Sequence, residues 1–144
     1  EFRRVLFRSE VGYALYGNDL DDAHSTLESG LGWITKLDKG DFVGREALAS
    51  QKAAGVPRKL VGMKLTGRGF PRPGYEIVHD DTVVGSVTSG TVSPTLGVGI
   101  AMGYVPTELS AAGTVVEIDA RGRRVEAVVQ RPPFYTEGSI RRSL

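Results

Sequence analysis

The chain has 144 residues, which is enough for one domain or for one domain and part of another. Hydrophobic residues make up 40% of it and cysteine is absent, which fits a globular fold and excludes disulfides, thiolate catalysis and cysteine-ligated metal sites. With a net charge of +1 and no apolar run near the roughly 18 residues of a membrane span, we predict neither nucleic-acid binding nor membrane association.

Residues 1–9 differ in character from the rest, because they carry three arginines against one glutamate. They lack the apolar core of a secretory signal. We interpret them as a non-native or truncated leader, foreign sequence joined at a truncation. The alternative is a native strand end, since Val5, Leu6 and Phe7 suit a strand.

Residues 10–20 are the most site-like stretch, with carboxylates, tyrosines and glycines close together. Glu10 has two interpretations: a solvated carboxylate at a strand end, or an acceptor for a donor-rich ligand edge such as an aminopyrimidinone ring. Tyr16 could stack on such a ligand, hydrogen bond to it, or merely pack. The following residues, 16–19, have the composition of a turn.

Residues 27–34 place apolar side chains around two glycines, and we expect close backbone packing there with Trp33 and Ile34 among the anchors. The clearest helix is predicted over residues 44–54. Asp41 is its expected N-cap, and Gly55 is expected to close it. This helix would connect two regions of the chain.

From residue 58 the pattern changes to short strands separated by turn residues. We predict strands over residues 59–65, 75–79, 83–88, 99–105, 115–120 and 124–129, with hairpins across residues 80–81 and 121–122. Five or six short antiparallel strands indicate a small closed barrel or a Greek-key sandwich. The predicted fold class is mainly β with minor α: a C-terminal small antiparallel Greek-key β-barrel preceded by a helical or mixed tail.

Catalytic motifs are scarce in this sequence. His24 and His79 have no metal-ligand neighbour three or four residues away, so we interpret both as surface or turn residues. The glycines of residues 67–69 are not followed by the lysine of a phosphate loop, and no Gly-x-Ser-x-Gly elbow occurs. We therefore predict no catalytic residue and no metal site in this chain.

Several motifs, taken in order, resemble one family. Residues 10–20 are similar to its Glu-Ala-Gly-x-x-Leu-Tyr-Gly-Asn-Glu-Leu, residues 27–33 to its Leu-Glu-Ala-Gly-Leu-Gly-Trp, and residues 39–48 to its Lys-x-Asp-Phe-Ile-Gly-Arg-Glu-Ala-Leu. Residues 88–96 and 132–135 are similar too. From residue 10 to about residue 136, the chain resembles the C-terminal portion of the glycine cleavage system T-protein family, the aminomethyltransferases.

The resemblance implies a division of the chain. Residues 1–9 would be the leader and residues 10–56 the end of the folate-binding aminomethyltransferase domain. Residues 57–136 would be the C-terminal β-barrel domain and residues 137–144 a tail.

The resemblance also implies what the whole protein does. The family takes the aminomethyl group carried on the lipoylated H-protein, transfers the one-carbon unit to tetrahydrofolate and releases ammonia. Glu10 matches the family's glutamate that holds the pteridine ring, with Tyr16 beside it. Lys39 lies near a basic folate contact of the family, and Arg141 corresponds to a basic residue close to its carboxyl terminus. The family's catalytic aspartate lies upstream of the matching part, so we expect the chain alone to be inactive.

Two alternatives stay open. The C-terminal folate regions of sarcosine and dimethylglycine dehydrogenases share similar motifs, and the chain could also be an inactive structural or binding module. The folate-dependent iron–sulfur assembly branch carries a cysteine where this chain has Asp41, which argues against that branch. The expected compartment is the bacterial cytoplasm, or the mitochondrial matrix for a eukaryotic source.

Overall fold

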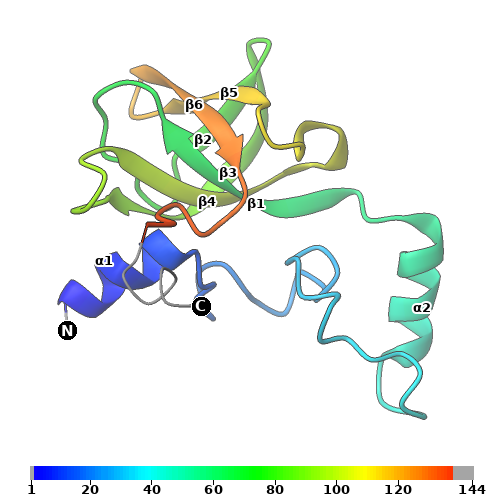
Figure 1. The fold of residues 1–144 in the computed structure, drawn as a ribbon. Helices are drawn as coiled ribbons and strands as arrows, with labels where there is room; N and C mark the ends of the chain where they lie inside the picture. Colours follow the sequence, from blue (N-terminus) through cyan, green and yellow to red (C-terminus); the bar gives the residue numbers. More distant parts are fainter. Residues whose placement is uncertain (1, 138–144) are drawn as a thin grey trace.

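Six antiparallel strands close into a barrel in the computed structural model, which describes residues 2–137 (Figure 1). Their order around the barrel is β1-β4-β3-β2-β5-β6, and β6 pairs with β1 to close it. Since β2, β3 and β4 are successive neighbours and β1 lies beside β4, the connection is a Greek key. The strands are β1 (Arg58–Leu65), β2 (Glu76–His79), β3 (Thr82–Val92), β4 (Gly99–Pro106), β5 (Val115–Asp119) and β6 (Arg124–Gln130), with a 3-10 turn η1 (Thr107–Leu109) after β4. The predicted fold class is confirmed.

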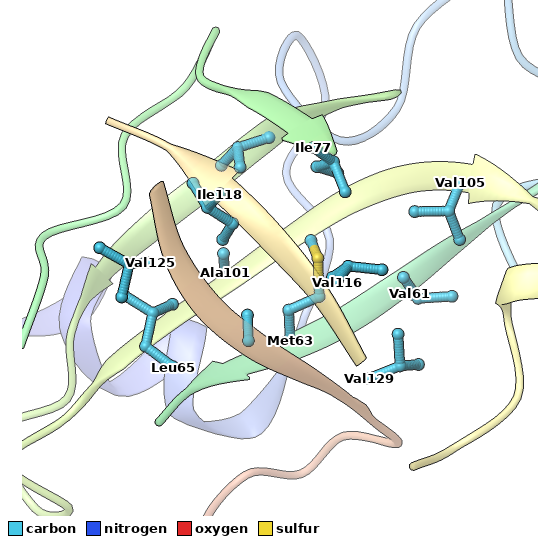
Figure 2. Close-up of a cluster of buried hydrophobic side chains, with 12 residues drawn as sticks. Val61, Met63, Leu65, Ile77, Ala101, Val105, Val116, Ile118, Val125 and Val129 are labelled. Atoms are coloured by element: carbon cyan, nitrogen blue, oxygen red, sulfur yellow. The ribbon is translucent and has the colours of Figure 1, made fainter. Parts of the chain in front are cut away.

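Apolar side chains fill the barrel interior. On β1, Val61, Met63 and Leu65 alternate with residues that face outward, as the sequence pattern predicts. Met63 and Ile77 are 0% exposed, and Figure 2 shows them with Val116 and Ile118 in one cluster. Because a small barrel is filled by its own side chains, this domain is a solid scaffold, and candidate binding residues are to be sought around it.

Both predicted hairpins are present. The β2–β3 turn places Asp80 at φ 48° and Asp81 at φ 59°, and the β5–β6 turn places Arg121 at φ 60° and Gly122 at φ 85°. Two successive residues with positive φ form the turn whose twist matches that of the flanking strands. Aspartate and glycine tolerate this conformation better than most residues do, which is why the turns could be read from the sequence.

Two helices precede the barrel, and they correct two expectations. Residues 5–7 lie in α1 (Phe2–Val11), which packs against β3 and β4, so the strand alternative is wrong (Figure 1). The second helix, α2 (Arg45–Ala54), lies where it was predicted. Its N-cap is Gly44 at φ 87° with no side-chain cap, so the assignment of Asp41 as the cap is wrong. A left-handed glycine turns the chain directly into the helix and leaves Asp41 outside the capping position.

Between the helices, residues 12–44 run beneath the barrel as a series of turns (Figure 1). Trp33 is 74% exposed and Ile34 is 50% exposed, so their expected role as buried anchors is wrong. Gly30 has φ +74°, and a Cβ added there would meet nothing within 4 Å. Glycine at this position therefore allows a left-handed turn and is not required for close packing.

Within residues 2–137, no helix has the length and apolar character that crossing a membrane requires.

Candidate functional site

Three buried carboxylates join residues 10–31, which we call the docking segment, to the barrel. Glu10 is 4% exposed, Asp19 1% and Glu28 5%. Burying a carboxylate is costly unless hydrogen bonds replace the water it loses. Each of the three therefore depends on donors in its surroundings, and those donors define the arrangement of the site.

Glu10 lies near the end of α1 and binds the loop between β3 and β4. Its Oε1 accepts hydrogen bonds from the Ser93 hydroxyl and from the Thr95 backbone N–H, the latter at 2.9 Å. Its Oε2 accepts the Thr95 hydroxyl at 3.0 Å, and its carbonyl oxygen accepts the Phe134 N–H at 2.8 Å. The interpretation as a solvated strand-end carboxylate is wrong. Three of the roughly four acceptor positions of this carboxylate are occupied within the fold. Direct contact with a pteridine stays a prediction.

Asp19 binds β3 directly. Its Oδ1 accepts the Thr88 hydroxyl at 2.5 Å, and its Oδ2 accepts the Ser89 hydroxyl at 2.8 Å and the Leu15 N–H at 2.9 Å. The carbonyl oxygen of Asp19 also accepts the Tyr104 hydroxyl of β4 at 2.9 Å. The turn that contains Asp19 is thus attached to two strands of the barrel.

Tyr104 of the barrel contacts three residues of the docking segment: Asp19, His24 and Ser29. Its hydroxyl shares a hydrogen bond of 2.8 Å with Ser29, and the His24 ring stacks on its ring at 3.8 Å between centroids. Burial raises the pKa of the Tyr104 phenol above 10.0, so the hydroxyl remains a neutral donor near neutral pH. His24 Nδ1 lies 2.7 Å from Asp21, and this hydrogen bond lowers the pKa of Asp21. Residues 2–137 contain no group of three or more histidines or acids that could hold a metal.

Glu28 connects the docking segment to β1. Its Oε1 accepts Arg58 Nε at 3.0 Å, and its Oε2 accepts the Ser25 N–H at 2.9 Å. The Ser25 hydroxyl accepts the Glu28 N–H at 3.2 Å, which gives the reciprocal pattern of a capping box. The Glu28 carbonyl accepts the Leu60 N–H at 2.8 Å. Glu28 therefore fixes a local turn and attaches it to the barrel.

We expect Glu28 to make the stability of the chain depend on acid pH. Burial alone would raise the pKa of Glu28, but hydrogen bonds from Ser25 and Arg58 outweigh it and hold the pKa below 4.5. Because the unfolded state then binds the proton more tightly, this stabilisation is complete above about pH 4.5 and declines as the pH falls through the folded-state pKa. Urea unfolding at several pH values should show a shallower acid decline for Glu28→Gln.

The matched control for that measurement is Glu46→Gln, because Glu46 is exposed on α2. This control should keep the acid decline of the unsubstituted chain. We also expect Glu28→Gln to lose about 1–3 kcal/mol of unfolding free energy near neutral pH, since a charge-assisted hydrogen bond becomes a neutral one. Equal acid declines in the two variants would show that Glu28 is not the responsible group.

Two other candidate residues, Tyr16 and Lys39, are exposed, and their side chains take no part in the hydrogen bonds that attach the docking segment to the barrel. Tyr16 is 70% exposed, and its hydroxyl donates to Asp22 at 3.0 Å, which raises the pKa of the Tyr16 phenol. Lys39 is exposed in the turns before α2, where it borders a shallow groove with Lys36 and Phe42. No hydrogen bond or ion pair joins Glu10, Tyr16 and Lys39 within residues 2–137. Arg141 lies outside the described residues.

A family model described as the glycine cleavage T-protein C-terminal barrel domain matches residues 58–136. The chain belongs to the glycine cleavage T-protein family. An aminomethyltransferase of Nostoc sp. (strain PCC 7120) is 50% identical over 133 residues, which are 92% of this chain and 35% of that protein. An aminomethyltransferase of Bacteroides fragilis (strain YCH46) is 53% identical over 133 residues, 91% of this chain and 37% of that protein.

A solved structure of the T-protein family is also similar to this chain. The crystal structure of the glycine cleavage system aminomethyltransferase T from Bartonella henselae superposes with a TM-score of 0.86 at 31% identity, covering 92% of this chain and 38% of that chain. Our chain thus spans little more than a third of the length of these relatives. The predicted resemblance to the C-terminal portion of the T-protein is confirmed.

Sequence reasoning missed most of the residues that attach the docking segment. Asp19 was interpreted only as part of a turn, and Glu28, Ser29 and Tyr104 received no role. The available signal was the high content of hydroxyl side chains over residues 88–95, where five of the eight residues are serine or threonine. Buried hydroxyls need partners, and the acids of the docking segment supply them.

Proposed function

We propose that the whole protein containing this chain is a tetrahydrofolate-dependent aminomethyltransferase of the glycine cleavage system. One observation supports the proposal: over about nine-tenths of its length, the chain is 50–53% identical in sequence to proteins named aminomethyltransferase. In this proposal the whole protein receives the aminomethyl group from the lipoylated H-protein, passes the one-carbon unit to tetrahydrofolate and releases ammonia. The bacterial sources of the relatives support the bacterial cytoplasm as the compartment.

The docking segment would supply part of the folate pocket. Tyr13 and Tyr16 are 69% and 70% exposed, so their rings are free to pack against a planar ligand or against another part of the whole protein. Glu10 would contribute to holding the pteridine. Lys39 and Arg141 would contact the carboxylates of the folate, because lysine and arginine pair with such groups. These assignments rest on the resemblance of the motifs.

The decisive experiment uses the full-length protein that contains this segment. Purified full-length protein, aminomethylated H-protein and tetrahydrofolate should together release ammonia, and release should slow strongly when tetrahydrofolate is omitted. Calorimetric titration should give a saturable tetrahydrofolate site. Absence of both results would overturn the proposal. A flavin bound by the full-length protein would support the dehydrogenase alternative.

We further expect the 144-residue chain alone to release no ammonia above the rate without protein. The chain spans only 35–37% of the length of its relatives. The family resemblance implies that the catalytic aspartate lies upstream of the matching part. The same ammonia assay, run with equal molar amounts of the chain and of the full-length protein, tests this. Folate-dependent turnover by the chain alone would show that it contains a complete active site.

A further inference from the structure

Strand β3 has an irregularity at the point where Asp19 binds. Val87 pairs with Gly103 and Ser89 pairs with Met102, so Thr88 is the extra residue of a β-bulge. In a regular strand, successive side chains point to opposite faces of the sheet. The hydroxyls of Thr88 and Ser89 nevertheless both donate to the carboxylate of Asp19. The bulge lets two consecutive side chains reach the same carboxylate, because such irregularities change the direction of a side chain.

The partners of Asp19 are all neutral. Two hydroxyls and one backbone N–H bind its oxygens, and none of the salt bridges within residues 2–137 involves Asp19. An amide in its place could keep the Ser89 and Leu15 bonds through its oxygen and donate to the Thr88 hydroxyl, which can turn its own proton to the Met102 carbonyl at 3.1 Å. An amide of the same shape would therefore keep neutral hydrogen bonds at this site and lose the charge-assisted ones.

Asp19 also determines the shape of the turn that precedes it. Its carboxylate accepts the Leu15 N–H, while the Leu15 carbonyl accepts the N–H groups of residues 18, 19 and 20. Asn18 adds a bond of 3.4 Å from its side chain to the Thr88 carbonyl. Tyr16 lies at the exposed side of this closed turn. A change at Asp19 would therefore be transmitted to Tyr16 through the turn, without Asp19 touching any ligand.

We propose that Asp19 is a positioning residue for the folate pocket, because it attaches the 15–20 turn to the β3 bulge and so fixes Tyr16 against the pteridine-bearing cosubstrate. This inference rests on the proposed function. It assigns the hydroxyls of Thr88 and Ser89 to the same task. The barrel would then act in folate binding as the support of one pocket wall.

The first arm of the test uses the 144-residue chain and needs no folate. Asp19→Asn should accelerate amide hydrogen exchange of residues 15–20 by about tenfold, the expected effect of turning charge-assisted hydrogen bonds into neutral ones, while the core strands keep their protection. Asp38→Asn is the control, because Asp38 is exposed and makes no side-chain hydrogen bond or ion pair with the residues from 2 to 137. Exchange that rises equally in the barrel core would show a general structural role and overturn the inference.

The second arm uses the full-length protein. Asp19→Asn should raise the KM for tetrahydrofolate by about tenfold and leave kcat within about twofold, since the turn positions the cosubstrate without taking part in the chemistry. Ser89→Ala, which removes one donor and keeps Asp19, should raise the KM less, and it serves if Asp19→Asn fails to fold. Unchanged KM in both variants would overturn the inference. If the unsubstituted full-length protein bound no folate, the proposed function would fail while the first arm still decided the attachment.

Discussion

Gly85→Ala should destabilise the barrel by about 3 kcal/mol or more, the upper range for an inserted methyl group that the structure cannot accommodate. A Cβ at residue 85 would lie 1.9 Å from the carbonyl oxygen of Tyr104 and 3.1 Å from its carbonyl carbon. Both atoms belong to the backbone of β4, which pairs with β3, so no side-chain rotation can relieve the clash. Strands β3 and β4 would have to move apart, and these two strands also bind the docking segment through Ser89 and Tyr104.

The matched control is Gly67→Ala. A Cβ there would meet only Val125 Cγ1 at 3.5 Å, an ordinary contact, and Gly67 is not among the glycines with positive φ. We expect its effect to stay within about 0.5 kcal/mol, as for other surface substitutions. Urea unfolding of the 144-residue chain, followed by circular dichroism, compares the two. Similar midpoints for both variants would contradict the close approach of β3 and β4 at Gly85.

The Gly85 substitution should also release the docking segment. Tyr104 supplies the hydroxyl that holds the Asp19 carbonyl and the ring on which His24 stacks. A displaced Tyr104 backbone would shift both groups. Amide exchange of the docking segment should therefore increase in Gly85→Ala, whereas Asp19→Asn should loosen the 15–20 turn and leave the barrel intact.

The parts of the fold that could be predicted are those with short-range causes. The β2–β3 and β5–β6 hairpins follow from turn residues that tolerate positive φ, flanked by strand-forming residues. The inward alternation of Val61, Met63 and Leu65 follows from the period of a strand. The helix over residues 45–54 follows from alanine-rich sequence between two glycines. Each of these depends on neighbours within a few residues.

The parts that could not be predicted depend on distant partners. Glu10 and Ser93 are 83 residues apart, and Asp19 and Ser89 are 70 apart, so no local pattern announces their hydrogen bonds. The β3 bulge follows from pairing with β4 and from the demand of a buried carboxylate, not from the preference of Thr88. Trp33 was misplaced for a related reason: an apolar residue is expected inside, yet 74% of this side chain is exposed in the described part of the chain. Single exposed apolar residues are common on protein surfaces, so residue type alone could not place Trp33.

Glu10→Gln should weaken tetrahydrofolate binding by the full-length protein by about 1–3 kcal/mol, roughly fivefold to 150-fold, the value of a charge-assisted hydrogen bond. Two mechanisms predict this loss. In the first, the carboxylate uses its remaining acceptor position to hold the amino-pyrimidinone edge of the pteridine. In the second, its bonds to Ser93 and Thr95 hold α1 on the barrel, and the pocket wall moves when they weaken.

A modified ligand separates the two mechanisms. A tetrahydrofolate analogue with a methyl group in place of the 2-amino group lacks a donor that the carboxylate would accept. If Glu10 touches the pteridine, the substitution should cost much less with the analogue than with tetrahydrofolate, because the contact is already missing. If Glu10 acts only through the β3–β4 loop, the loss should be equal for both ligands. Glu108→Gln, at an exposed glutamate of η1, should leave both affinities unchanged. Unchanged tetrahydrofolate affinity in Glu10→Gln would remove Glu10 from the folate site altogether, and its three hydrogen bonds to the barrel loop would then account for its burial.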